Sequence, residues 1–114
     1  MVIDASAQYI HIMLHGEYDI ARQEELRSEL EPAYCAAMAL LDMSAVSYID
    51  ASALTELIRL RKHMPEPAII RMVGVMANIR RLLNVTGLVK MFEIYDTVKN
   101  ALTEWQMEQG SPRR

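Results

Sequence analysis

Residues 40–54 read LLDMSAVSYIDASAL, and this stretch decides the fold. It begins inside an apolar run, residues 36–41, which Asp42 ends. A short run that is apolar at every position is typical of a strand covered on both faces, and a buried helical turn is the weaker alternative. Beyond Asp50, apolar side chains recur at helical spacing at Leu54, Leu57 and Ile58. The stretch predicts a buried strand, a loop from Asp42 to Asp50 and a helix to about residue 64.

The residues before this stretch predict another strand and another helix. From residue 8 to residue 15, apolar and polar side chains alternate, which indicates a half-buried strand. The turn at residues 16–19, Gly-Glu-Tyr-Asp, breaks the alternation. Asp19 can accept hydrogen bonds from the free amides at a helix start, and the helix that follows ends before Pro32.

Strands and helices keep alternating after residue 64. Two prolines force a turn at residues 65–67, and an apolar strand follows at residues 68–73. Arg71 within that strand suggests a sheet edge or a partly open face. A third helix stops at Gly87, because glycine is the usual residue just past a helix end. A short strand at residues 91–94 and a last helix capped by Asp96 complete the pattern.

This alternation predicts the α/β class. We expect a single domain over residues 1–108, with a small mixed β-sheet of four to five strands packed with about four helices. Residues 109–114 should form a flexible tail. The length of 114 residues and the hydrophobic content of 52% fit one compact core.

The composition also limits the compartment. Cys35 is the single cysteine, so no intrachain disulfide can form, and a reducing compartment, the cytoplasm, is favoured. Cys35 is better explained as a small apolar filler than as a redox sensor. The longest apolar run, residues 33–41, is shorter than the roughly 20 residues of a membrane span, and no secretion signal is expected.

The net charge of −3 hides an uneven distribution. Residues 1–57 carry ten acidic and two basic residues, a balance of −8, while residues 58–114 carry ten basic and five acidic residues, a balance of +5. If the fold keeps these halves apart, the surface is dipolar and orients a charged protein partner. Solvated helix faces of mixed sign are the other reading.

The motifs of common chemistry are not found in the sequence. There is no glycine-rich phosphate loop, no cysteine or histidine cluster at metal-binding spacing and no nucleophile elbow. We therefore expect no catalytic residues, no metal site, no cofactor and no enzyme. The acidic isoelectric point of 5.6 and the lack of aromatic residues among the arginines disfavour direct nucleic-acid binding.

The junction at residues 40–54 resembles the signature of the STAS domain family, the anti-sigma-factor antagonists. In that family a buried strand ends at Asp, and a second Asp after a short apolar loop opens an Asp-Ser-Ser/Thr-Gly-Leu pattern at a helix start. Residues 16–19 are similar to the Gly-Glu-Leu-Asp turn of the family. Residues 80–88, RRLLNVTGL, are similar to its third helix and the Gly-Leu that follows. The resemblance covers about residues 8–105 in the right order.

The resemblance implies a stand-alone bacterial regulatory domain, active in transcription regulation and signal transduction through protein–protein interaction. Its implied partner is a cytoplasmic anti-sigma factor that is also a serine kinase of the GHKL ATPase type. Such a domain frees the sigma factor when it is unphosphorylated, and it releases its partner when a serine at the start of the second helix is phosphorylated, which makes it a phosphoprotein. The implied docking face is the turn before the first helix and the start of the second. The expected partner-binding residues are Tyr18, Asp19, Asp50, Ala51, Ser52 and Leu54.

The chain departs from the family where the phosphoacceptor belongs. That position is Ala51, which has no hydroxyl, and Ser52 follows it. One helical step turns a side chain by about 100° and moves it about 1.5 Å along the axis. Three readings of Ser52 therefore stay open. It is a candidate phosphoacceptor, or it is a residue at the helix start whose side chain satisfies a backbone amide. In the third reading, phosphorylation at this place does not regulate the domain. Ala53 stands where the family usually has glycine. Met76 stands where the family often has a serine that caps the third helix.

Two other functions stay open. Some STAS domains are accessory subunits that bind the ATPase of a lipid ABC transporter, and a weakened acceptor position suits that role. The other alternative is an enzyme that uses Ser52 with a histidine.

Overall fold

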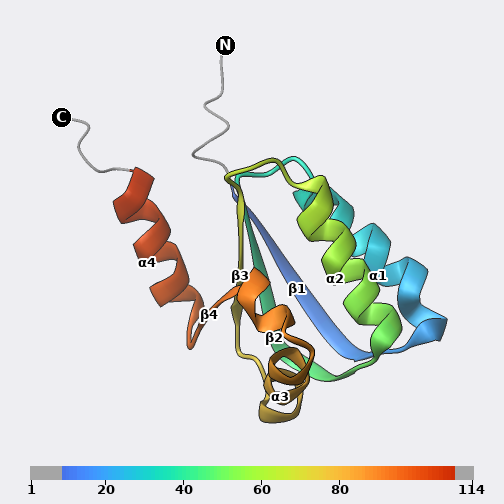
Figure 1. Ribbon diagram of the computed structural model, residues 1–114. Coiled ribbons are helices and arrows are strands. Elements are labelled where there is room, and N and C mark those ends of the chain that lie inside the picture. Colours follow the sequence, from blue (N-terminus) through green and yellow to red (C-terminus); the bar gives the residue numbers. More distant parts are fainter. Residues whose placement is uncertain (1–8, 110–114) are drawn as a thin grey trace.

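A four-stranded sheet forms the centre of the molecule (Figure 1). The computed structural model describes residues 9–109. The strands are β1 (Tyr9–Tyr18), β2 (Met38–Ile49), β3 (Ile69–Val73) and β4 (Glu93–Tyr95). Their order in the sheet is β1-β2-β3-β4, and all three pairings are parallel. Because the sheet order follows the chain order, the first half of the sequence supplies β1 and β2 and the second half supplies β3 and β4.

Helices cover both faces of the sheet. They are α1 (Gln23–Leu30), α2 (Ala51–His63), α3 (Ala77–Thr86) and α4 (Val98–Gln109). Three short 3-10 helices lie between them: η2 (Ile20–Arg22), η3 (Glu31–Ala33) and η4 (Leu88–Met91). Helices α1 to α3 contribute to the larger core on one face, and α4 packs alone on the other (Figure 1).

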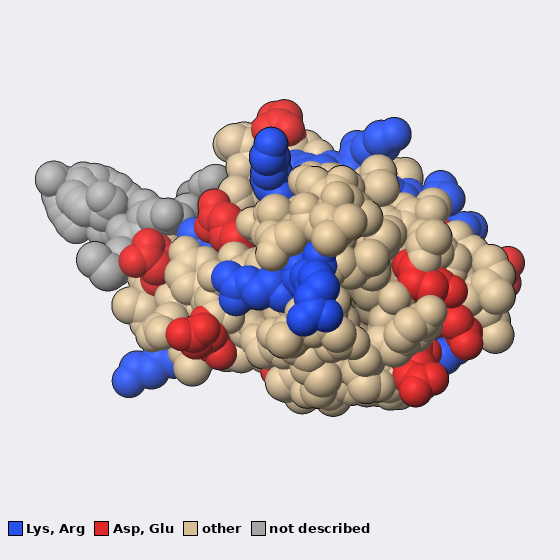
Figure 2. All heavy atoms as spheres, turned by 60° about the horizontal axis from the view of Figure 1, so that its bottom comes forward, with Lys and Arg blue, Asp and Glu red and all other residues tan. Residues whose placement is uncertain are grey.

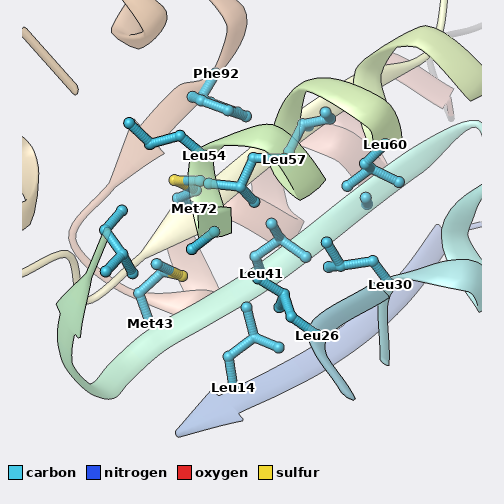
Figure 3. Packing of buried hydrophobic residues seen from close by; sticks show 14 of the residues in the cluster. Leu14, Leu26, Leu30, Leu41, Met43, Leu54, Leu57, Leu60, Met72 and Phe92 are labelled. Atoms are coloured by element: carbon cyan, nitrogen blue, oxygen red, sulfur yellow. The ribbon is translucent and has the colours of Figure 1, made fainter. Parts of the chain in front are cut away.

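Strand β2 supplies both cores, because its side chains point alternately to the two faces. Leu41 and Met43 lie in the larger core, with leucines from α1 and α2 packed around them (Figure 3). Leu40 belongs to the smaller core, which α4 closes with Ala101 and Trp105. Leu40 and Leu41 are both fully buried, which makes β2 the strand covered on both faces that the apolar run predicts.

The α/β class, the four strands and the four helices confirm the expectation from the sequence. The strand directions differ from it. Every pairing within residues 9–109 is parallel, so this part of the chain shows no antiparallel strand of a mixed sheet. Most of the expected tail lies outside the described residues, and Gln109 ends α4.

Strands β1 and β2 are longer than expected, because two irregularities hide their periodicity. Strand β1 continues to Tyr18 instead of ending at residue 15, and β2 continues to Ile49 instead of ending at Asp42. The pairing steps from Met13↔Asp42 to His15↔Ala45, and from Gly16↔Val46 to Glu17↔Tyr48. At each step β2 contains one residue more than β1, which is a β-bulge. Each bulge shifts the alternation of side chains by one residue, so residues 42–49 look like a loop in the sequence.

Three further expectations were wrong. Arg71 is not at an edge: β3 pairs with β2 and β4, and the arginine is 1% exposed. Cys35 is exposed in the loop before β2 and does not fill the core. At the start of α4, it is the Thr97 hydroxyl that accepts from the Asn100 amide, at 3.0 Å, one residue after Asp96.

No helix in the described part of the chain has both the length and the apolar character needed to cross a membrane.

Candidate partner-binding site

The carboxyl ends of β1 and β2 lie side by side and lead into the candidate site. Tyr18 is paired with Ile49, and the Asp50 amide donates to the Tyr18 carbonyl at 3.2 Å. Helix α2 begins at once after Asp50. The turn after β1 and the first turn of α2, far apart in the sequence, thus form one surface.

Asp50 caps helix α2. Its Oδ1 accepts from the Ser52 amide at 2.9 Å and from the Ala53 amide at 3.2 Å. The Ser52 hydroxyl also donates to Oδ1, at 2.5 Å. This hydroxyl, together with the backbone amides of Ala53, Ser52 and Ile20, keeps the pKa of Asp50 below its ordinary value. The carboxylate is therefore charged at neutral pH and fixed at the helix start.

The first turn of α2 presents a methyl group outward and a hydroxyl toward Asp50. Ala51 is exposed, while Ser52 is half-buried and its hydroxyl is engaged by Asp50. Ala53 is 1% exposed and packs in the larger core. The methyl group that replaces the family's glycine hydrogen thus points into the core. Leu54, at 8% exposure, is buried beside it.

Tyr18 joins β1 to the helical layer. Its side chain is 1% exposed, and its hydroxyl donates to Glu29 Oε1 at 2.8 Å and accepts from the His15 amide at 3.1 Å. The Arg22 guanidinium lies 4.1 Å from the ring centre. Burial, partly offset by the His15 hydrogen bond and reinforced by the Glu29 carboxylate, raises the pKa of Tyr18. Tyr18 and Leu54 can support a partner-binding surface from beneath.

Asp19 stabilises the turn that follows β1. Its side chain accepts from the Ala21 amide at 3.0 Å and so caps η2, not α1. Of the six expected residues, Asp19, Asp50, Ala51 and Ser52 lie at least partly on the surface. The set as a whole stays a prediction of the partner-binding site.

Three exposed apolar side chains around these residues were missed by the sequence analysis. Ile20 is 71% exposed, Tyr48 46% and Met76 40%. Tyr48 lies two residues before Asp50, and Ile20 directly follows Asp19. Asn78 donates to the Ser47 carbonyl at 3.1 Å, which ties the start of α3 to the end of β2. The positions of Ile20 and Tyr48 close to the two capping aspartates can be read from the sequence. The exposure of the three side chains cannot.

A group of possible metal ligands also forms only in the structure. Ligand atoms of His15, Glu25 and Glu29 lie within 4.8 Å of one another. Arg22 binds both oxygens of Glu25, at 3.1 and 2.9 Å, and Tyr18 donates to Glu29. Because a guanidinium already neutralises one carboxylate, this group fits a surface network of ion pairs and hydrogen bonds better than a cation site.

Glu56 is a buried carboxylate that holds α1 against α2. It accepts from Gln23 at 2.8 Å, from Arg27 at 3.0 Å through two nitrogens, and from Arg59 at 3.0 Å. The hydrogen bonds from Arg27, and then those from Gln23 and Arg59, outweigh the effect of burial and lower the pKa of Glu56 to about 2. This network fixes the direction in which α2 presents its first turn.

Solved structures of low sequence identity share this fold. An anti-sigma factor antagonist from Mycobacterium paratuberculosis superposes with a TM-score of 0.76 at 23% identity, over 93% of this chain and 90% of that one. An anti-sigma-factor antagonist (STAS) domain protein from Planctomyces limnophilus gives 0.71 at 20% identity, over 78% and 80%. A sulfate transporter family protein from Wolinella succinogenes gives 0.72 at 17% identity, over 97% and 93%.

No curated protein sequence matches the chain significantly. The family model described as "STAS domain" matches residues 2–101, which is most of the chain and includes both capping aspartates, both bulges and helix α3. The chain belongs to the STAS domain family.

Proposed function

We propose that this chain is a regulatory protein-binding domain, not an enzyme, and that it acts as an anti-sigma-factor antagonist in the bacterial cytoplasm. Its partner would be an anti-sigma factor that is also a serine protein kinase of the GHKL ATPase type. The observation that carries the proposal is the junction at Asp50. A charged cap fixes the first turn of α2 beside a second capped turn, and exposed apolar side chains surround both.

The chemistry of this surface suits reversible docking. Ile20, Tyr48 and Met76 offer apolar area to a partner, while Asp19 and Asp50 hold the backbone and leave the helix start rigid. A rigid surface loses little conformational entropy on binding, which favours affinity. These features support protein contact, and not the transformation of a substrate, as the proposed role of this site.

Docking can be tested with the purified kinase that a pull-down from the native cell identifies. We expect Ile20→Glu and Ala51→Glu to abolish its binding in a calorimetric titration. Met13→Glu is the matched control, since Met13 is 69% exposed but lies within β1, away from the strand end. If the kinase binds all three variants like the wild type, the docking face is elsewhere. If it does not bind the wild type, the antagonist proposal fails.

Ser52 is our candidate for the phosphoacceptor. A phosphoryl group adds about −1.5 to −2 charges, and a helix N-terminus tolerates such charge. The transfer would break the hydrogen bond from the Ser52 hydroxyl to Asp50 and place a second anion beside that carboxylate. The added repulsion would change the docking face without unfolding the domain.

Intact-mass measurement after incubation with the kinase and ATP decides this switch. We expect the wild type to gain one phosphoryl group and Ser52→Ala to gain none. Ala51→Ser restores the family's acceptor position and serves as the positive control. Modification of Ala51→Ser but not of the wild type would show a docking domain without the Ser52 switch.

The second candidate is a STAS accessory subunit that binds the ATPase of a lipid ABC transporter. The observation that favours it is Ala51, which removes the hydroxyl at the family's acceptor position. The fold itself does not distinguish antagonists from transporter-related proteins, since a sulfate transporter family protein superposes about as well as the antagonists. Recovery of a transporter ATPase, and not of a kinase, in the pull-down would favour this candidate.

A further inference from the structure

Helix α3 carries two arginines that the rest of the described structure leaves without a carboxylate. Residues 9–109 contain seven arginines, and five of them form an ion pair with a glutamate, namely Arg22, Arg27, Arg59, Arg61 and Arg71. Arg80 and Arg81 are exposed and form no ion pair with any described residue. Among the described arginines, the two without an ion pair are therefore neighbours on the same helix.

Exposed apolar side chains flank these two arginines. Val85 is 78% exposed and Met76 is 40% exposed. Residues four apart are neighbours on a helix surface, so Arg81 lies beside Val85, and Met76 directly precedes the first turn of the helix as its N-cap residue. Val85 and Met76 belong to the small group of large apolar residues that the described surface exposes. The outer face of α3 thus combines cationic and apolar groups that have no partner within the described domain.

This face adjoins the candidate docking site. The hydrogen bond from Asn78 to the Ser47 carbonyl holds the start of α3 against the end of β2, close to Tyr48 and Asp50. Figure 2 looks toward the bottom of Figure 1, where α3 lies, and shows basic side chains near the centre of this face with uncharged surface around them. Acidic side chains gather mainly toward the rim of the view.

We propose that the outer face of α3 binds an acidic segment of the partner protein, in which carboxylates contact Arg80 and Arg81 and an apolar side chain covers Val85. Guanidinium groups pair with carboxylates in a bidentate manner, and arginine is enriched where protein interfaces carry most of their energy. The inference rests on the proposed function and deepens it, because it states the chemistry of the partner. It also adds a part of the basic half of the chain, helix α3, to the docking face that the acidic half supplies.

Photo-crosslinking in the native cell tests this inference with the full chain. Val85 is replaced by photoreactive benzoylphenylalanine, and after irradiation the attached segment is identified by mass spectrometry. We expect a crosslink to one protein, at a segment with at least two aspartates or glutamates close together. The same replacement of Met13 on β1 is the control position, where we expect no crosslink to that segment.

A charge reversal shows whether the arginines direct the contact. We expect Arg80→Glu combined with Arg81→Glu to lower the crosslink yield about tenfold or more, because like charges would then repel the acidic segment. Lys62→Glu combined with Lys99→Glu changes the net charge equally on other helices and should leave the yield unchanged. All four side chains are exposed, and circular dichroism verifies that both variants fold.

Each of four results would overturn the inference: no crosslink from position 85, a crosslink to nucleic acid, a segment without carboxylates, or equal yields from the two charge-reversed variants. The proposed function fails separately. An acidic segment in a protein that is not an anti-sigma factor would support this face and refute the antagonist role. A kinase that binds the wild type and the Arg80→Glu/Arg81→Glu variant equally would support the antagonist role and refute the proposed role of the α3 face.

Discussion

Gly74 sets the shape of the sheet next to the bulged part of β2. Its φ is +69°, in the left-handed region that favours glycine, and a Cβ at this position would lie 2.7 Å from Ser44 Cβ and 2.9 Å from Ser44 Cα. The Asp42 carboxylate holds Ser44 from the other side, accepting from its amide at 3.0 Å and its hydroxyl at 2.7 Å. The side chains of Asp42 and Ser44 and the bare Cα of Gly74 thus define the first bulge of β2.

We expect Gly74→Ala to lower the free energy of unfolding by about 2–4 kcal/mol, the sum of left-handed strain and overpacking against Ser44. Gly87→Ala is the matched control, because Gly87 has a φ of +79° but no atom within 4 Å of the added Cβ. It should cost about 1–2 kcal/mol from strain alone. Urea denaturation measures both. Equal losses would show that Ser44 moves away without cost.

The contacts between helices and strands depend on buried charges. Glu56 joins α1 to α2, and Arg71 joins β3 to β4 and α4. The Arg71 guanidinium donates to Glu93 Oε1 and to the Ala101 carbonyl, each at 2.8 Å, and lies 5.0 Å from the Tyr95 ring centre. Hydrophobic periodicity identifies each of these helices and strands separately, but it does not say how they lie relative to one another. Both networks fix that arrangement.

The Glu56 network should make the free energy of unfolding fall at acidic pH. A pKa lowered from 4.5 to about 2 corresponds to about 3 kcal/mol in favour of the ionised form in the folded protein. This contribution is fully present above the unfolded pKa near 4.5 and is lost as pH falls toward 2. We expect Glu56→Gln to destabilise the protein by about 2–4 kcal/mol at pH 7 and to flatten the acid dependence of its unfolding free energy.

Urea titrations between pH 7 and pH 2 measure this effect. Glu25→Gln is the control, since Glu25 pairs with Arg22 at the surface and should change stability little. An acid dependence in Glu56→Gln that equals that of the wild type would contradict the assignment.

The Arg71 network should stabilise the packing of α4 against the sheet. Trp105 is the single tryptophan, lies on α4 and is 5% exposed, so its fluorescence reports whether the helix is docked. We expect Arg71→Ala to remove the hydrogen bond to the Ala101 carbonyl and to leave a cavity beneath α4. The emission of Trp105 should then shift to the red at lower urea than the loss of far-ultraviolet circular dichroism. In the wild type the two signals should coincide. Coincidence in the variant would mean that Arg71 is not needed to hold α4.

The domain as a unit consists of two cores that share one sheet. Leu40 and Leu41 are neighbours in β2, both fully buried, but Leu40 contacts the α4 side and Leu41 the side of α1, α2 and α3. Since β2 is central to both layers, a cavity on either side weakens the same sheet. The acidic half of the sequence supplies β1 and β2, and the basic half supplies β3 and β4, so the two halves occupy different sides of the sheet.

We expect Leu40→Ala and Leu41→Ala each to cost about 2–5 kcal/mol of unfolding free energy. Only Leu40→Ala should alter the native emission of Trp105, because only Leu40 shares its core with that residue. Urea unfolding followed by circular dichroism, together with native fluorescence spectra, measures the two effects. A change of Trp105 emission in Leu41→Ala would show that the cores are not separated by the sheet.

The amino-acid sequence was sufficient for the α/β class, the number of helices, the family and the helix start after Asp50. These depend on local periodicity and on short motifs, which are properties of neighbouring residues. The sequence did not reveal the full lengths of β1 and β2, because each bulge shifts the alternation of side chains while the backbone stays paired. The turn at residues 16–19 was recognised as a motif but is mostly strand.

Only the tertiary structure decided which distant side chains meet. It buried Tyr18 under Arg22, surrounded Glu56 with cationic and amide groups, and placed Arg71 beneath α4. It also left Arg80, Arg81 and Val85 on an open helix face beside the docking site. Ion pairing and exposure depend on contacts between residues far apart in the chain, and no local pattern encodes them.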